Sequence, residues 1–426
     1  MPTPYIERRL LILLFIFSVA IRYTWAYLSG VDNFSLHDWT RYDGQSDEIL
    51  RGNFNLETDL FITAPLFSYT VALLKFVFGD SFESILELCQ IVLSSVSVIY
   101  LCLTANVLFR SNKVSLLVGV TFSLYPITLY WVHVFGQETF FQAFLIIGLY
   151  YFTRYFRDGK STTILLASIV LSLALLTKSH ILLAFPFFAL SLIATSPKSF
   201  DALRPIGIMI ITILIITAPY GIYNKITNGT YVISSSGGGG YFLTGHNEDI
   251  YTYIVSPPLI GTEEHKRLAS MDFYVFRDLA PKLQGLSHAE KQSLYFKTGL
   301  DWAKSNIEKS IVLAGVNLKN FLKPGFHKGH QDPKLWMISF LLALPVFVLA
   351  YFEIARSLIN DWKSHTQIAS LFLAMGLFSI LFYSQNRFRV ITIEPWYLMY
   401  GCNCLIFIFQ RLSTRKSTGR EQKVGY

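Results

Sequence analysis

The chain is dominated by long apolar runs, and these limit it to a fold that lies in a lipid bilayer. A transmembrane helix needs about 20 mostly apolar residues. Of the 426 residues, 52% are hydrophobic and only 15% are charged, whereas soluble domains carry about 25% charged residues. The sequence therefore predicts an all-α polytopic membrane protein with about ten transmembrane helices. They are expected at 10–28, 84–109, 114–133, 138–153, 161–177, 180–194, 205–221, 335–355, 366–384 and 391–410.

Basic residues between the apolar runs predict the orientation of the chain. We expect the first run to be an uncleaved span and the run at 62–78 to be a juxtamembrane or re-entrant helix. The basic clusters then all fall on the side of the N-terminus, as the excess of Lys and Arg in cytoplasmic loops requires. We therefore attribute the net charge of +8 to these cytoplasmic clusters. We do not expect a nucleic-acid partner. The clusters are Arg8/Arg9, Arg110/Lys113, Arg154/Arg157/Lys160, Lys198/Arg204, Arg356/Lys363 and the tail from Arg411.

The same pattern divides the chain into three parts. Residues 1–221 form an N-terminal transmembrane module whose first outer loop covers 29–83, and residues 335–426 supply the last spans and a basic cytoplasmic tail. Residues 222–334 contain no apolar run long enough to cross, so we expect a small folded cap outside the membrane. Within it, Ser287 and Glu290 have the spacing of a capping box at a helix start.

Two acidic residues lie just outside predicted spans on the outer side. Asp38 follows the first span, and Glu138 begins the fourth. Charged groups at the membrane are unfavourable and usually functional. Each residue also has a simpler interpretation. Asp38 shares its loop with several other acidic residues, and Glu138 could favour the N-terminal dipole of its helix.

Several short motifs resemble, in their order and placement, those of one enzyme family. They are Arg22, Asp38-x-x-x-Tyr42, Ala64-Pro65-Leu66-Phe67 with Phe78-Gly79, Glu138, Leu175-Leu176-Thr177-Lys178, Gly245-His246-Asn247, and Arg387-Phe388-Arg389 with Glu394-Pro395. The family is that of polytopic glycosyltransferases of the GT-C fold, close to glycosyltransferase family 39. It includes protein O-mannosyltransferases and the lipid A aminoarabinose transferase. Two departures, Thr63 in place of a Lys and Trp39 in place of a second acid, bear on which donor is used.

The resemblance implies the transfer of a sugar from a polyprenyl-phosphate-linked donor to an acceptor hydroxyl on the outer face. Asp38 would be the general base that removes the hydroxyl proton, and Glu138 would be the family's second acidic site residue, with a catalytic or metal-related role. Arg387 and Arg389 offer planar donors suited to phosphate, and their alternative role is to anchor the chain at the membrane interface. Further candidate phosphate ligands are Lys178 and Arg22, and candidate substrate contacts are Tyr42, His246 and Asn247.

No cluster in the sequence has metal-ligand spacing, so we expect no obligatory metal or cofactor. A divalent cation shared by Asp38 and Glu138 is left open, as is the acceptor, which is a protein, a lipid or a glycan. We expect the enzyme in a bacterial or archaeal cytoplasmic membrane, with its active site facing outside. The alternatives are a flippase or other transporter of lipid-linked saccharides, and a polymerase or ligase of them. Transporters tend to carry inverted repeats and charges at the bilayer midplane, and neither is visible here.

Overall fold

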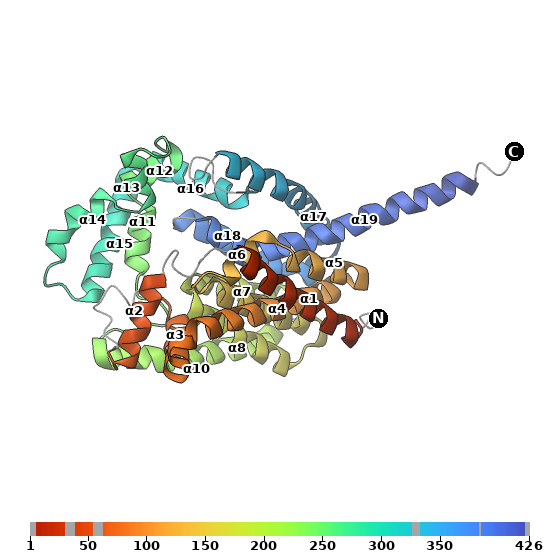
Figure 1. Ribbon diagram of the computed structural model, residues 1–426, viewed down its shortest axis with the longest axis horizontal. Helices are drawn as coiled ribbons and strands as arrows, with labels where there is room; N and C mark the ends of the chain where they lie inside the picture. The colour runs from red at the N-terminus through yellow and green to blue at the C-terminus, as the bar shows by residue number, and fades with distance from the viewer. Residues whose placement is uncertain (1–5, 30–38, 54–62, 326–332, 383–384, 422–426) are drawn as a thin grey trace.

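The computed structural model describes residues 6–29, 39–53, 63–325, 333–382 and 385–421. Within those ranges every regular element is a helix, as predicted. Figure 1 shows a bundle of long helices with a group of short helices at one end. At the opposite end of the bundle, α1 begins and α19 extends away from it. The two ends of the bundle are therefore structurally different.

The N-terminal part is built around α7, which packs against both α4 and α8. A Cβ atom on Gly148 of α7 would lie 2.7 Å from Leu171 Cγ of α8, so the glycine allows close approach of the two helices. Small residues serve this purpose between membrane helices, where packing contacts drive association. The helices of this part are α1 (Arg8–Ser29), α2 (Trp39–Leu50), α3 (Pro65–Phe78), α4 (Phe82–Phe109), α5 (Asn112–Ser123), α6 (Pro126–Val132), α7 (Glu138–Asp158), α8 (Ser161–Thr177), α9 (Ala184–Thr195) and α10 (Leu203–Asn228).

Helix α3 covers most of the apolar run at 62–78. It begins at Pro65, a residue favoured in the first helical turn, and ends at Gly79, whose φ of 54° suits a helix C-terminus. Phe67 and Val71 on one face are fully buried, and the helix contacts α2, α4 and α8. Its failure to cross the membrane stays a prediction.

A group of six short helices follows α10, in the region predicted to form a cap. The expected capping box is confirmed, because Ser287 and Glu290 bond reciprocally at the start of α15. Helix α11 lies against α15 so closely that a Cβ on Gly239 would be 1.9 Å from the Gln292 carbonyl oxygen. The helices are α11 (Gly238–Gly245), α12 (Glu248–Val255), α13 (Glu263–Ala269), α14 (Tyr274–Leu279), α15 (His288–Ser305) and α16 (Ile307–Leu322).

The C-terminal part contains α17 (Pro333–Leu381), α18 (Asn386–Thr392) and α19 (Glu394–Glu421). Helix α17 is interrupted at Asp361, whose φ of −151° and ψ of 58° are not helical. Phe347 and Phe372 both contact Tyr397, with ring centroids 4.6 and 5.3 Å away. In a straight helix these two residues would be about 38 Å apart. Helix α17 therefore doubles back at Asp361 into two legs.

The helices make this an integral multi-pass membrane protein, and the count of ten spans stays a prediction. Four described helical stretches are long and apolar enough to cross, or six when two bent pairs of helices each count as one span. One of the four, Trp336–Leu381, contains the two legs of α17. The two shorter apolar stretches are Ser161–Thr177 and Ser179–Thr195. Two of the predicted spans, 335–355 and 366–384, fall on the two sides of the interruption at Asp361.

Candidate active site

Three charged side chains from distant parts of the chain converge at one point. Glu138 begins α7, Lys178 directly follows α8, and Arg387 lies in the first turn of α18. Lys178 Nζ lies 2.9 Å from Glu138 Oε1, and Arg387 Nη1 lies 3.8 Å from the same oxygen. The Glu138 and Lys178 side chains are only 4% and 5% exposed, whereas that of Arg387 is 27% exposed. Two cations thus face one buried carboxylate, and these three described side chains together carry one net positive charge.

The turn before Glu138 is fixed by contacts with α4. Gln90 Nε2 donates to the carbonyl oxygens of Val132 and Val134, at 2.5 and 3.0 Å. His133 lies between the Glu87 carboxylate, 2.7 Å from Nδ1, and the Arg22 carbonyl oxygen, 3.1 Å from Nε2. These bonds satisfy backbone and side-chain groups that would otherwise be unpaired in a poorly hydrated place. The start of α7 is therefore held in one position.

Tyr42 of α2 reaches the same cluster through Gln137. When the Gln137 amide nitrogen donates to the Thr177 carbonyl oxygen, its side-chain oxygen accepts from the Tyr42 hydroxyl at 3.0 Å and from Lys178 Nζ at 3.3 Å. The Tyr42 ring is buried against Phe67, with centroids 5.0 Å apart. Of the predicted substrate contacts within the described residues, Tyr42 is thus the one linked to the charged cluster, by way of Gln137.

Aromatic rings enclose the cluster and bring in His180, which sequence reasoning missed. The centroid of the Phe388 ring lies 5.7 Å from both Lys178 Nζ and the Arg387 guanidinium carbon. The His180 ring contacts Phe388 and Phe378, at 5.3 and 5.2 Å. Its Nε2 is buried, and no described residue hydrogen-bonds to it. Gln137 and His180 lie one and two residues from predicted site residues, and that proximity was the only signal for them.

Arg389 lies only two residues from Arg387 but has a different environment. Its Nε donates to Glu394 Oε1 at 2.8 Å, and its Nη1 and Nη2 donate at 2.7 Å to the carbonyl oxygens of Lys323 and Gly325. The side chain is buried, and its contacts tie α18 to the end of α16 and the start of α19. These bonds engage Arg389 within the protein, so it is a weaker candidate for a phosphate than Arg387.

Arg22 is also held inside the bundle. Its Nε donates to Ser94 Oγ at 2.8 Å and its Nη1 to Ser18 Oγ at 2.5 Å, and the residue is fully buried between α1 and α4. Among the described residues, none forms an ion pair with Arg22. The structure connects it to the Glu138 turn through its backbone, by way of His133, and does not bring its guanidinium to the cluster.

His246 and Asn247 lie in the group of short helices after α10. Asn247 caps α12 by accepting from the Ile250 backbone N–H at 2.9 Å. His246 stacks on Phe242 with ring centroids 4.2 Å apart, and burial lowers the pKa of His246. Contacts between aromatic rings continue from Phe242 to Phe382, at 6.1 Å, and on through Phe378 to His180. The short helices therefore adjoin the end of the bundle that holds the charged cluster, without placing His246 in it.

Asp38, the predicted base, lies outside the described residues. The next residue, Trp39, begins α2 and packs edge-on against Phe135, with ring centroids 5.2 Å apart. Within the described ranges, no three His, Cys, Asp or Glu side chains are grouped so that they could hold a metal ion. A cation shared by Asp38 and Glu138 is thus neither supported nor opposed.

A comparison with known families finds a match for the segment that contains Glu138 and Lys178. Residues 63–223 match the family model described as dolichyl-phosphate-mannose-protein mannosyltransferase. The match covers 161 of the 426 residues. The resemblance drawn from the short motifs is thereby confirmed, and the family is one of membrane glycosyltransferases. No curated protein sequence matches the chain.

Two solved structures of an archaeal oligosaccharyltransferase share the fold. The AglB protein from Archaeoglobus fulgidus, in complex with an inhibitory peptide and a dolichol-phosphate, matches with a TM-score of 0.54 and 14% identity over 98% of this chain. A crystal structure of the Archaeoglobus fulgidus oligosaccharyltransferase with zinc and sulfate matches with the same score and identity over 95% of the chain. The chain spans about half of each, 52% and 50%. At this identity the likeness shows the GT-C fold alone.

Proposed function

We propose that this protein is a glycosyltransferase that moves a sugar from a polyprenyl-phosphate-linked donor to an acceptor hydroxyl. The observation that carries the proposal is the pair of cations, Lys178 and Arg387, gathered on one buried carboxylate beside a segment of the mannosyltransferase family. The dolichyl-phosphate mannose named in the family description is a donor of this class, and we propose it as the first to test.

Lys178 and Arg387 are suited to stabilise the leaving group of this reaction. When the glycosidic bond breaks, negative charge develops on the leaving lipid phosphate, and donors already in place stabilise it best where water is scarce. Arg387 has the planar geometry suited to phosphate oxygens, and its side chain reaches the surface of the protein. Lys178 supplies a second positive charge beside the same carboxylate oxygen. We propose that these two residues bind the donor phosphate.

Glu138 fits the role of a positioning residue for those cations. Its carboxylate is buried and already engaged with Lys178 at 2.9 Å, so it is poorly placed to accept a proton from an acceptor. A single carboxylate between two cations keeps both in the site while leaving net positive charge for the phosphate. We therefore propose that Glu138 orients Lys178 and Arg387, and that it does not itself react.

Asp38 is our proposal for the general base. A base of this kind must come within hydrogen-bond reach of the acceptor hydroxyl. Support comes from its sequence neighbour Trp39, which packs against Phe135 in the turn before Glu138, and from Tyr42, which joins the cluster through Gln137. Both residues lie in α2, the helix that begins directly after Asp38. We propose that deprotonation of the acceptor and departure of the phosphate occur in one inverting displacement.

The same account includes the predicted orientation and the kind of acceptor. We propose that the end of the bundle with the charged cluster faces the outside of the membrane, since the basic clusters at the other end, such as Arg110 and Arg356, are typical of cytoplasmic loops. The lipid tail of the donor would stay in the bilayer while its phosphate reaches Arg387.

The family description names a protein acceptor, so we propose the hydroxyls of Ser and Thr in a protein as the first acceptors to test.

A transfer assay tests this function. The full chain is purified, reconstituted in lipid, and given labelled polyprenyl-phosphate mannose with a Ser/Thr-containing peptide. We expect labelled peptide from the native chain, loss of transfer in Asp38→Asn, and weaker use of the donor in Arg387→Ala. Arg277→Ala is the control, because Arg277 is an exposed arginine of α14 paired with Asp272. Movement of the lipid across the membrane without any covalent product would instead identify a transporter and overturn the proposal.

A further inference from the structure

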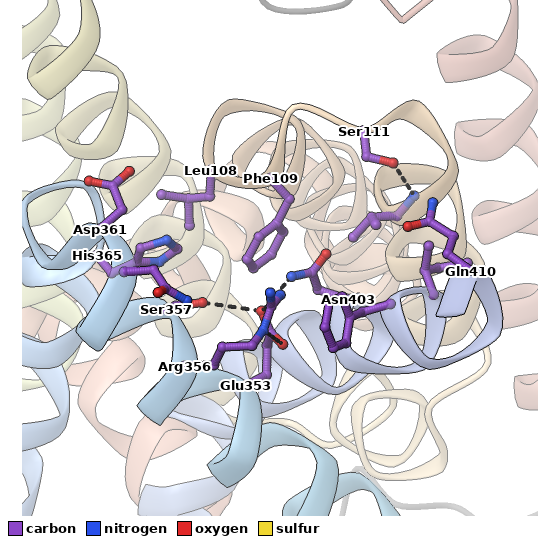
Figure 2. A pocket seen from close by; sticks show the side chains of 14 residues that line it. Leu108, Phe109, Ser111, Glu353, Arg356, Ser357, Asp361, His365, Asn403 and Gln410 are labelled. Atoms are coloured by element: carbon purple, nitrogen blue, oxygen red, sulfur yellow. Dashed lines mark hydrogen bonds and ion pairs between the residues drawn. The ribbon is translucent and has the colours of Figure 1, made fainter. Parts of the chain in front are cut away.

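A polar cavity lies at the end of the bundle away from the charged cluster. It has a volume of about 300 Å³ and is bounded by the C-terminal end of α4, the start of α5, the bend of α17 and the middle of α19 (Figure 2). Helix α19 runs from Glu394, near the cluster end, to Gln410 at this cavity. Sixteen residues of helix span about 24 Å, which approaches the hydrocarbon thickness of a bilayer. The cavity therefore belongs to the opposite membrane surface.

The carboxylate at the base of this cavity is fully satisfied by its neighbours. Glu353 accepts from Arg356 Nε and Nη2 at 2.9 and 2.6 Å, from Ser357 Oγ at 3.2 Å and from Asn403 Nδ2 at 2.6 Å. Glu353 itself is completely buried. Its charge is thus balanced, and no described residue accepts a hydrogen bond from Arg356 Nη1. Figure 2 shows the guanidinium at the wall of the cavity.

An apolar groove of about 380 Å³ adjoins the polar cavity, and Phe407 lines both. The guanidinium carbons of Arg356 and Arg411 lie over the Phe407 ring, 4.1 and 4.5 Å from its centroid. The groove itself is lined by exposed apolar side chains of α17 and α19, among them Val348, Phe352 and Leu412. Arg356 and Arg411 therefore lie where the apolar groove meets the polar cavity.

The charge around this junction favours an anion. Arg110 follows Phe109 of the cavity wall, and Arg157 of α7 interacts electrostatically with both Arg110 and Asp361. Asp361 is the one exposed carboxylate that lines the cavity, and Arg157 offsets it. With Glu353 balanced by Arg356, the other charges among the described side chains at the junction are net positive. Basic pockets between transmembrane helices on the cytoplasmic side bind the headgroups of anionic lipids.

We propose that this junction is a binding site for one anionic phospholipid. Its phosphate would lie against Arg356 and Arg411 at the Phe407 ring, the polar part of its headgroup would enter the cavity beside Asn403, and its acyl chains would lie in the groove between α17 and α19. A lipid bound there would bridge the bend of α17 and the middle of α19 and so stabilise the contact between these two helices. It does not depend on the proposed transferase activity.

Lipid titration followed by native mass spectrometry tests the proposal on the full chain, purified and delipidated in detergent. We expect one phosphatidylglycerol to bind more tightly than phosphatidylcholine. Because one arginine near lipid phosphate contributes about a fivefold change in binding, Arg411→Gln should weaken phosphatidylglycerol binding about fivefold. Lys363→Gln is the matched control: Lys363 is an exposed cation of α17 that lines neither cavity nor groove.

Two further measurements test how much the acyl chains and Arg356 each contribute to the affinity for phosphatidylglycerol. Glycerol 3-phosphate, which has the phosphate without acyl chains, should not compete with phosphatidylglycerol. The double variant Glu353→Gln/Arg356→Gln, which keeps the buried position neutral, should weaken phosphatidylglycerol binding as Arg411→Gln does. Equal affinity for phosphatidylglycerol and phosphatidylcholine, full competition by glycerol 3-phosphate, or an Arg411→Gln effect no larger than that of Lys363→Gln would each overturn the proposal.

Discussion

Replacing Glu138 by Gln tests how strongly the charged cluster depends on its single carboxylate. The change leaves Lys178, 5% exposed, without its 2.9 Å partner and leaves Arg387 facing a second cation. Removing one partner of a buried pair typically costs about 3–5 kcal/mol, because the other charge stays buried and unbalanced. We therefore expect the free energy of unfolding to fall by that amount. The measurement is equilibrium unfolding of the full chain in mixed detergent micelles.

The control for this variant is a second Lys–Glu pair at the surface. Lys266 and Glu263 are 2.7 Å apart but 63% and 91% exposed, and exposed pairs contribute about 0–1 kcal/mol. Glu263→Gln should therefore have little effect. The Glu138→Gln/Lys178→Gln double variant should recover part of the lost stability, because the unbalanced ammonium is gone. If Glu138→Gln destabilises no more than Glu263→Gln, the cluster is hydrated and the reasoning from burial fails.

Three other predictions concern the donor site and the short helices. Arg387→Ala should raise the donor concentration needed for half-maximal transfer by about tenfold, because it removes one hydrogen bond to a charged group. Steady-state kinetics measure this, and Arg387→Lys should recover part of the loss. Gly239→Ala should destabilise the α11–α15 contact by about 1–3 kcal/mol, because its Cβ would meet the Gln292 carbonyl oxygen at 1.9 Å; Gly238→Ala, with open space around it, should not. Burial lowers the pKa of His246 below its ordinary 6.5, so the unfolded chain takes up the proton first and stability should fall as pH drops below 6.5. Thermal melts of the native chain and His246→Asn across pH 5–8 check this, and equal pH dependence would contradict it.

The grouping of Glu138, Lys178 and Arg387 was partly accessible from sequence, whereas the difference between Arg387 and Arg389 was not. Residues two apart on a helix point in different directions, so only one of the two arginines can face Glu138. Which one does so depends on how α18 is rotated, and that is fixed by the bonds of Arg389 to Glu394 and to the backbone of Lys323 and Gly325. Such contacts between distant segments leave no local pattern.

The helical class and the capping box at Ser287 followed from local patterns, because apolar content and cap spacing are local properties. The count of ten spans stays a prediction, because length and apolar content alone do not show which helices cross the membrane. His180 was missed because its neighbours are distant in sequence. Its contacts with Phe378 and Phe388 come from parts of the chain about 200 residues away, and a lone histidine in an apolar run carries no signal of its own.

The central claim is that sugar leaves a polyprenyl phosphate at the Glu138 end of the bundle. Proteoliposomes sorted by orientation, given a water-soluble short-chain polyprenyl-phosphate mannose and acceptor peptide from outside, test it directly. The account predicts labelled peptide only when the end with Lys178 and Arg387 faces the added substrates, and none with Asp38→Asn. Transfer only from the end with Arg356 and the basic tail, or no transfer in either orientation, would contradict it.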